Sequence, residues 1–105
     1  MQFGRAENME PLEPGNLNRA ANEAIQEVYH QDQLARAGRF HGTHIMPGGP
    51  DMARLAVLAE EFGEVSHEVT EGMMDSAYPN AELRKELVQV AAVTIAWIAA
   101  LDEGR

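Results

Sequence analysis

The stretch KELVQVAAVTIAWIAAL, residues 85–101, decides the fold of this chain. It is rich in Ala and Val and contains no Gly or Pro, so it predicts a long, uninterrupted helix. Its apolar residues lie on nearly every side, which is typical of a helix surrounded by neighbours. Two polar residues near its start, Glu86 and Gln89, therefore need an explanation from the rest of the chain.

The N-terminal part of the chain predicts a tail, one helix and a long connection. Residues 1–15 hold two Pro and two Gly without periodicity, which indicates a flexible tail. From Asn16 apolar residues recur every three or four positions, and Gly38 supplies a stop. RFHGTHIMPGGP, residues 39–50, has the length of many binding loops. We expect residues 16–105 to form a single domain.

Two further helices are predicted after this loop. Asp51 is a good N-cap residue for a helix over residues 51–71, which we expect Gly72 to end, and Asn80 caps a third helix over residues 81–102. The predicted core side of the second helix is formed by Leu58, Phe62, Val65 and Val69. No strand pattern or internal repeat is found, so the expected fold class is all-α. A small three-helix chain with one helix apolar all round is expected to complete its core as a homodimer or homotetramer.

Charge and composition exclude several classes of function. The formal net charge of −9 repels phosphate groups, so nucleic acids and anionic membranes are poor partners. The chain has no cysteine, which excludes disulfides, thiolate zinc sites and a cysteine nucleophile. The N-terminus lacks the apolar core of a signal peptide, and the longest apolar run is shorter than the roughly 20 residues of a membrane span. We therefore expect a cytoplasmic protein.

The second predicted helix carries a stripe of acidic residues beside its apolar side. The stripe consists of Glu60, Glu61, Glu64, Glu68 and Glu71. On a helical wheel these residues fall within an arc of about 100°. A solvated face is the common interpretation of such a stripe. However, Val57 lies inside the arc, and the acids at i and i+4 repel one another with no Lys or Arg on the arc, so a bound cation would stabilise it.

Glu86 heads an apolar column on the third predicted helix, because Val93 and Trp97 lie within about 60° of it on the wheel. An ionised carboxylate in such surroundings costs several kcal/mol unless a cation or hydrogen-bond donors hold it, and otherwise it is protonated. Arg84 and Lys85 point about 100° or more away. The alternative is that Glu86, in the first turns, benefits from the helix dipole and still reaches water.

Taken together, EEFGE and ELVQ resemble the motifs of the MazG-type nucleoside triphosphate pyrophosphohydrolases, an all-helical family. The family pattern is two adjacent Glu, a third Glu three positions on, a spacer, and Glu-x-x-Asp on the next helix. Here Glu60, Glu61 and Glu64 match the first part. Glu86 and Gln89 match the second part after 21 intervening residues.

The resemblance covers about residues 16–102 and implies a MazG-type helical bundle that is completed by oligomerisation. It implies that Mg²⁺, with Mn²⁺ as a substitute, is bound by four metal ligands. These are Glu61, Glu64, Glu86 and Gln89. Glu60 would have the catalytic role of placing a ligand or the attacking water. The implied reaction is hydrolysis of a nucleoside triphosphate to the monophosphate and pyrophosphate, the work of a housecleaning hydrolase. Mg²⁺ suits hard oxygen ligands and phosphate chemistry.

Gln89 departs from the family pattern, which usually has aspartate at this position. A carboxamide oxygen can coordinate Mg²⁺ but adds no charge, so weaker metal binding is expected. Either Glu68 or Glu82 compensates, or the chain has lost hydrolysis and acts as a nucleotide-binding or helical interaction module. The sequence does not set the base or sugar preference.

The histidines and aromatic residues give weaker signals. His41 and His44, in HGTH, resemble half of a transition-metal site, but a solvated or substrate-facing loop is the preferred interpretation. We expect His67 to be an exposed helical residue. Tyr29 and Trp97 have helical spacing that favours the core over base stacking.

Overall fold

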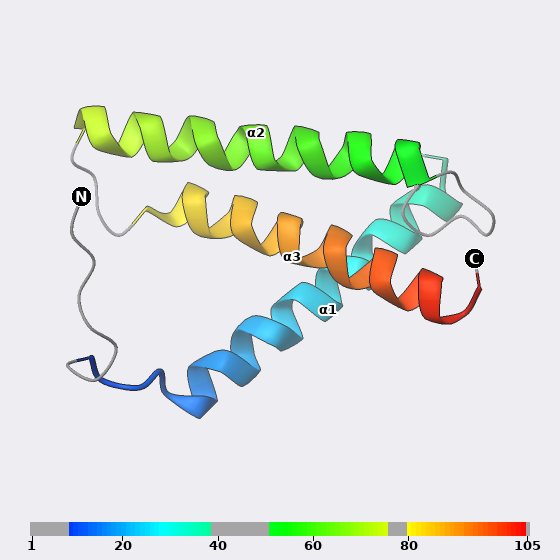
Figure 1. Ribbon diagram of the computed structural model, residues 1–105, viewed down its shortest axis with the longest axis horizontal. Coiled ribbons are helices and arrows are strands. Elements are labelled where there is room, and N and C mark those ends of the chain that lie inside the picture. Colours follow the sequence, from blue (N-terminus) through cyan, green and yellow to red (C-terminus); the bar gives the residue numbers. More distant parts are fainter. Residues whose placement is uncertain (1–8, 39–50, 76–79, 105) are drawn as a thin grey trace.

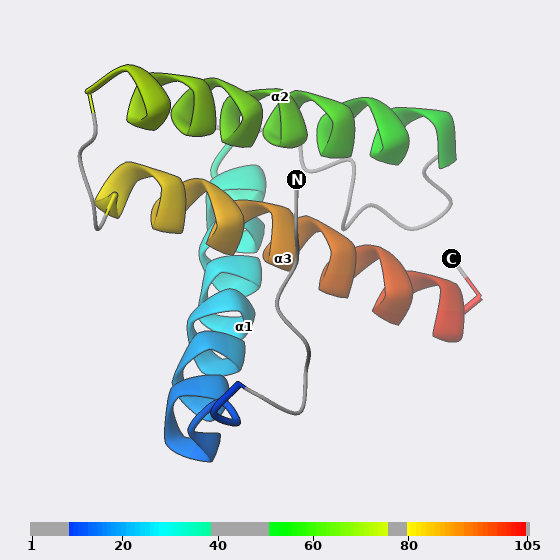
Figure 2. The ribbon, with the colours of Figure 1, turned by 60° about the vertical axis from the view of Figure 1, so that its left-hand side comes forward.

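The structure, a computed structural model, describes residues 9–38, 51–75 and 80–104. Within these ranges it contains three helices and no strand, which confirms the all-α class. The helices are α1 (Pro14–Arg36), α2 (Asp51–Asp75) and α3 (Ala81–Asp102). α2 and α3 run antiparallel and side by side, and α1 crosses α3 at a steep angle (Figure 1). Figure 2 shows the same crossing from another side, and α3 packs against both other helices.

Local signals set most of the helix ends. The side chain of Asn80 accepts a hydrogen bond from the backbone N–H of Leu83 at 3.1 Å, which confirms the predicted cap of α3. Gly38 and Gly104 follow the ends of α1 and α3 with φ angles of 73° and 75°. This left-handed conformation is easy for glycine and stops a helix.

Two predicted helix ends are wrong. α1 begins at Pro14, two residues before Asn16, because proline is well suited to the first turn of a helix. α2 does not end at Gly72 but continues to Asp75. A glycine inside a helix lowers its stability by only about 1 kcal/mol, so without a left-handed turn it does not end the helix.

The core of the described chain is built from small side chains. Its buried apolar residues are Ala24, Ala92, Val93, Ala96 and Ala100. Four of the five are alanine, which lets α1 approach α3 closely. α3 is not surrounded within a single chain, since Leu87 and Ile98 are about half exposed, and the expectation that a further copy of the chain completes its surroundings stays a prediction. Phe62, predicted in the core of α2, is also exposed, because α3 covers only one side of that helix.

Polar contacts fix the relative positions of the helices. The guanidinium of Arg84 on α3 donates two hydrogen bonds of 2.7 Å to the Glu23 carboxylate on α1. At the start of α2, Oδ1 of Asp51 accepts a hydrogen bond of 3.1 Å from Nε1 of Trp97. The same oxygen lies 3.6 Å from the guanidinium of Arg54, whose side chain is completely buried. In the described ranges, no helix has the length and apolar character needed to cross a membrane.

Candidate metal centre

Three glutamates from α2 and α3 meet where these helices lie side by side. Glu61 and Glu64 are one turn apart on α2, and Glu86 lies on the first turns of α3. Each offers a carboxylate oxygen, and the three oxygens lie within 4.8 Å of one another. Glu61 and Glu86 are half-buried, and Glu64 is exposed to solvent. We call these three residues the acidic trio.

The trio is electrostatically strained as a set of free carboxylates. Burial raises the pKa of Glu61 from 4.5 to about 7, and the charges of Glu64 and Glu86 add to the effect. A hydrogen bond with the Glu64 carboxyl raises the pKa of Glu86, and burial contributes as well. Lys85 acts in the opposite direction on Glu86 but does not cancel the rise. Each additional negative charge is therefore unfavourable here unless a proton or a cation compensates it.

Helix α1 adds two polar residues to this region. Glu27 contributes its negative charge to the groups that raise the pKa of Glu61. Gln31 is 4% exposed, and its Nε2 donates to Oε1 of Gln89 at 2.7 Å and, more weakly, to Oε1 of Glu27 at 3.4 Å. Oε1 of Gln31 is buried and finds no hydrogen-bond partner among the described residues. Such a group is costly in a folded chain and is often found near functional sites.

The structure brings three of the five predicted site residues together, and the other two, Gln89 and Glu60, lie outside that cluster. Glu61, Glu64 and Glu86 come together in the acidic trio. Gln89 lies on the same helix as Glu86, one turn on, and its carboxamide oxygen is engaged by α1. Glu60 is exposed, and its charge is among those that raise the pKa of Glu61.

Among the described residues, the other candidates are not members of the trio. His67 is exposed and 4.0 Å from Glu71, as expected for a surface residue. His41, His44 and the 39–50 loop fall outside the described residues. Of the two acids considered as compensation for Gln89, Glu68 adds its charge to the surroundings of Glu86.

The sequence interpretation missed Glu27 and Gln31. A signal for them was present, because both lie within about 60° of Ala24 on the wheel of α1, and Ala24 is buried. Two polar residues on the core side of a helix need partners from another helix. Which helix supplies the partners depends on how α1 crosses α3, and the spacing within α1 does not indicate this.

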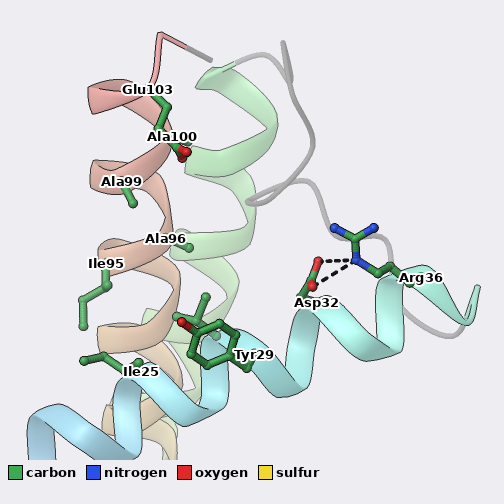
Figure 3. A pocket seen from close by; sticks show the side chains of 10 residues that line it. Ile25, Tyr29, Asp32, Arg36, Ile95, Ala96, Ala99, Ala100 and Glu103 are labelled. Atoms are coloured by element: carbon green, nitrogen blue, oxygen red, sulfur yellow. Dashed lines mark hydrogen bonds and ion pairs between the residues drawn. The ribbon is translucent and has the colours of Figure 1, made fainter.

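A separate groove of about 460 Å³ lies between α1 and the C-terminal half of α3 (Figure 3). Tyr29 and Ile95 line it, with the Asp32–Arg36 ion pair of 3.0 Å at one side. Tyr29 is 60% exposed, so the expectation that it belongs to the core is wrong. Trp97 is partly buried and bonded to Asp51. None of the trio lines this groove.

Comparisons of the chain with protein-family models, curated proteins and solved structures find no match. The interpretation of the site therefore depends on its geometry and chemistry. A group of carboxylates in which Glu61 and Glu86 are half-buried and have raised pKa values can bind protons or a hard cation. A cation held there can in turn attract an anionic ligand.

Proposed function

We propose that this protein is a Mg²⁺-dependent nucleoside triphosphate pyrophosphohydrolase of the MazG type, which forms a monophosphate and pyrophosphate. The observation that carries the proposal is the convergence of Glu61, Glu64 and Glu86, with carboxylate oxygens within 4.8 Å. Two consecutive helices, α2 and α3, supply these residues, and the pKa of Glu61 is raised to about 7. This arrangement has a cost that a bound divalent cation would remove.

The donor set fits Mg²⁺, and Mn²⁺ as its substitute. Carboxylate oxygens of the trio and the carboxamide oxygen of Gln89 are hard ligands, and no histidine of the described residues joins the cluster. Glu61, Glu64, Glu86 and Gln89 would hold the ion. When bound, it would neutralise phosphate charge and lower the pKa of a coordinated water.

The chain's own residues would orient the substrate and the water. Glu60 is exposed beside Glu61, so its carboxylate can reach solvent and accept a proton from the attacking water. Gln31 would keep the carboxamide of Gln89 in one orientation, because its buried amide donates to Gln89 Oε1. The substrate would be a nucleoside triphosphate, with hydrolysis between the α and β phosphates.

A second candidate function is nucleotide binding without hydrolysis, or a helical interaction module. The observation that favours it is the hydrogen bond of 2.7 Å between Gln31 and Gln89. At this position the related enzymes would have a charged aspartate, whereas here a neutral side chain is already engaged by another helix. A weakly bound ion could support recognition of a triphosphate without supporting its cleavage. Cytoplasmic location and assembly as a homodimer or homotetramer belong to both proposals.

Pyrophosphate release from a panel of ribo- and deoxyribonucleoside triphosphates, with Mg²⁺ or Mn²⁺, tests the enzymatic proposal. We expect turnover of at least one nucleotide by the wild-type chain, and loss of that turnover in a Glu64→Gln variant. Glu71→Gln is the matched control, because Glu71 is an exposed acid on the same helix outside the trio. A folded wild-type sample that cleaves none of the nucleotides contradicts the proposal.

Calorimetry distinguishes the second candidate function. A nucleotide that binds in the presence of Mg²⁺ and is recovered intact supports a binding module. If neither Mg²⁺ nor any nucleotide binds to the folded chain, both the enzymatic and the nucleotide-binding proposals are contradicted, and an interaction module is left.

A further inference from the structure

Glu27 differs from the other two acids of α1, because it has no basic partner among the described residues. Glu23 accepts two hydrogen bonds of 2.7 Å from the guanidinium of Arg84. Asp32 forms an ion pair of 3.0 Å with Arg36. Glu27 lies between these two acids in the sequence and is half-buried, and no Lys, Arg or His of the described ranges pairs with it. A partly buried carboxylate without a cation is unfavourable.

The carboxamide of Gln31 connects Glu27 with Gln89. Its Nε2 donates to Oε1 of Gln89 at 2.7 Å and to Oε1 of Glu27 at 3.4 Å, so one amide group lies between the two acceptors. The side chain of Gln31 is 4% exposed, and its own Oε1 has no hydrogen-bond partner among the described residues. A buried amide oxygen without a donor is rare and points to a missing water or ion. A hydrated cation beside Glu27 would bring hydrogen-bond donors to this place.

Glu27 lies one layer outside the acidic trio. Its charge is among those that raise the pKa of Glu61, so the two carboxyl groups are near enough to interact. Glu27 is not, however, one of the three residues whose oxygens lie within 4.8 Å of one another. Mg²⁺ usually keeps several of its waters, and carboxylates further out accept hydrogen bonds from such waters. The position of Glu27 fits this outer role.

Solvent reaches Glu27 through an open groove on the surface of α1. The groove has a volume of about 550 Å³ and is bounded by Val88 on α3. His30 and Arg19 are the basic residues in its wall, and neither forms an ion pair with Glu27. Arg19 lies about 12 Å from Glu27 along the helix axis. A hydrated ion therefore has access to the carboxylate of Glu27 from this groove.

We propose that Glu27 supplies the negative charge that Gln89 does not bring, as an outer carboxylate of the metal centre that accepts hydrogen bonds from metal-bound water. The inference rests on the proposed function, because it takes the centre to bind Mg²⁺. Gln31 links the neutral carboxamide of Gln89 to Glu27, so α1 places a charge beside the uncharged ligand. Among the described residues, neither Glu68 nor Glu82 has a side-chain hydrogen bond to Gln89.

Calorimetry of Mg²⁺ binding to the full chain, without nucleotide, tests the proposal. We expect Glu27→Gln to weaken Mg²⁺ binding about tenfold or more, the usual effect of losing an outer partner in a metal site. Glu27→Asp keeps the charge but shortens the side chain, so it should lose most of the same affinity, because a hydrogen bond to metal-bound water depends on reach. Both variants change a half-buried side chain outside the core.

Glu68→Gln is the matched control. It removes the same charge from an exposed acid, and the charge of Glu68 also acts on a member of the trio, Glu86. We expect a clearly smaller loss of Mg²⁺ affinity than in Glu27→Gln. Helical content by circular dichroism accompanies each variant. If Glu27→Gln is not folded, the comparison of Glu27→Asp with Glu68→Gln decides the result.

The outcomes separate this inference from the proposed enzymatic activity. Unchanged Mg²⁺ affinity in Glu27→Gln overturns the inference, as do equal losses in Glu27→Gln and Glu68→Gln, which would indicate a long-range effect of charge. Full affinity in Glu27→Asp also overturns the contact through water. A wild-type chain that binds no Mg²⁺ overturns the inference together with the metal-dependent function. If Mg²⁺ affinity depends on Glu27 but no nucleotide is cleaved, the inference stands and the enzymatic proposal is contradicted.

Discussion

The buried side chain of Gln31 on α1 donates a hydrogen bond of 2.7 Å to Oε1 of Gln89 on α3. The acceptor is the atom with which Gln89 would bind a cation. A carboxamide oxygen has two lone pairs, so it can accept from Gln31 and still coordinate an ion. The contact therefore connects α1 to the candidate metal centre, and in the proposed enzyme Gln31 is a positioning residue for Gln89.

Replacement of Gln31 by leucine should weaken metal binding. The variant keeps the volume of the side chain but removes the donor that orients Gln89. Loss of a residue that hydrogen-bonds to a metal ligand commonly costs about 10–100-fold in metal affinity. We expect calorimetry to show Mg²⁺ binding at least about tenfold weaker. Gln33→Leu is the control, because Gln33 is exposed on the same helix. Unchanged Mg²⁺ affinity in Gln31→Leu contradicts the positioning role.

Replacement of Gln89 by aspartate should have the opposite effect. The variant adds a negative charge to the site, so we expect Mg²⁺ affinity to rise by on the order of tenfold and any nucleotide cleavage to increase. In the absence of metal the same charge should lower the free energy of unfolding, because the pKa of Glu61 is already raised to about 7 by burial and neighbouring acids. Equal Mg²⁺ affinity in wild type and variant would indicate that Gln89 is not a ligand.

The sequence predicted the helices from local information, and the resemblance of EEFGE and ELVQ to a family motif predicted that Glu61, Glu64 and Glu86 would meet. Caps and stops such as Asn80 and Gly38 act within one turn of the chain, so the pattern alone indicates them. The convergence of Glu61 with Glu86 was also expected, because each lies near the apolar side of its own helix, where the two helices would pack.

The burial of individual residues was harder to predict. Phe62 lies on the apolar side of α2, and the wheel cannot indicate whether that side faces another helix of the same chain or a different molecule. The crossing of α1 over α3 brought Gln31 and Glu27 to the site, and it depends on long-range contacts such as the Arg84–Glu23 ion pair. Spacing within one helix contains no information about such contacts.

The stability of the metal-free protein should fall as the pH rises from about 4.5 to about 7. The pKa of Glu61 is raised from 4.5 to about 7 in the folded chain, chiefly by burial. Between these two values the folded chain keeps a proton that the unfolded chain has released, so each rise in pH favours unfolding. Urea denaturation in the presence of a chelator, compared near pH 5 and near pH 8, measures the effect.

Two comparisons check the origin of this pH dependence. Glu61→Gln should be more stable than wild type near pH 8 without metal, and its stability should vary less with pH over this interval. Saturating Mg²⁺ should raise the stability of the wild type near pH 8, because the ion replaces the proton as the compensating charge. A Glu61→Gln variant with the same pH profile as wild type would assign the effect to other groups.

Asp51 should contribute to stability through Trp97 and Arg54. Its Oδ1 accepts a hydrogen bond of 3.1 Å from the indole of Trp97 and lies 3.6 Å from the guanidinium of Arg54, whose side chain is completely buried. Asp51→Ala removes both interactions and should lower the free energy of unfolding by about 1–3 kcal/mol. Asp51→Asn keeps an acceptor for the indole and should lose less.

The fluorescence of Trp97, the single tryptophan of the chain, reports both unfolding and the loss of this contact. Urea titrations of wild type, Asp51→Asn and Asp51→Ala at one protein concentration give the three free energies. If Asp51→Asn is as unstable as Asp51→Ala, the charge beside Arg54 matters more than the hydrogen bond to Trp97. If neither variant is destabilised, the contact at the start of α2 does not hold α2 against α3.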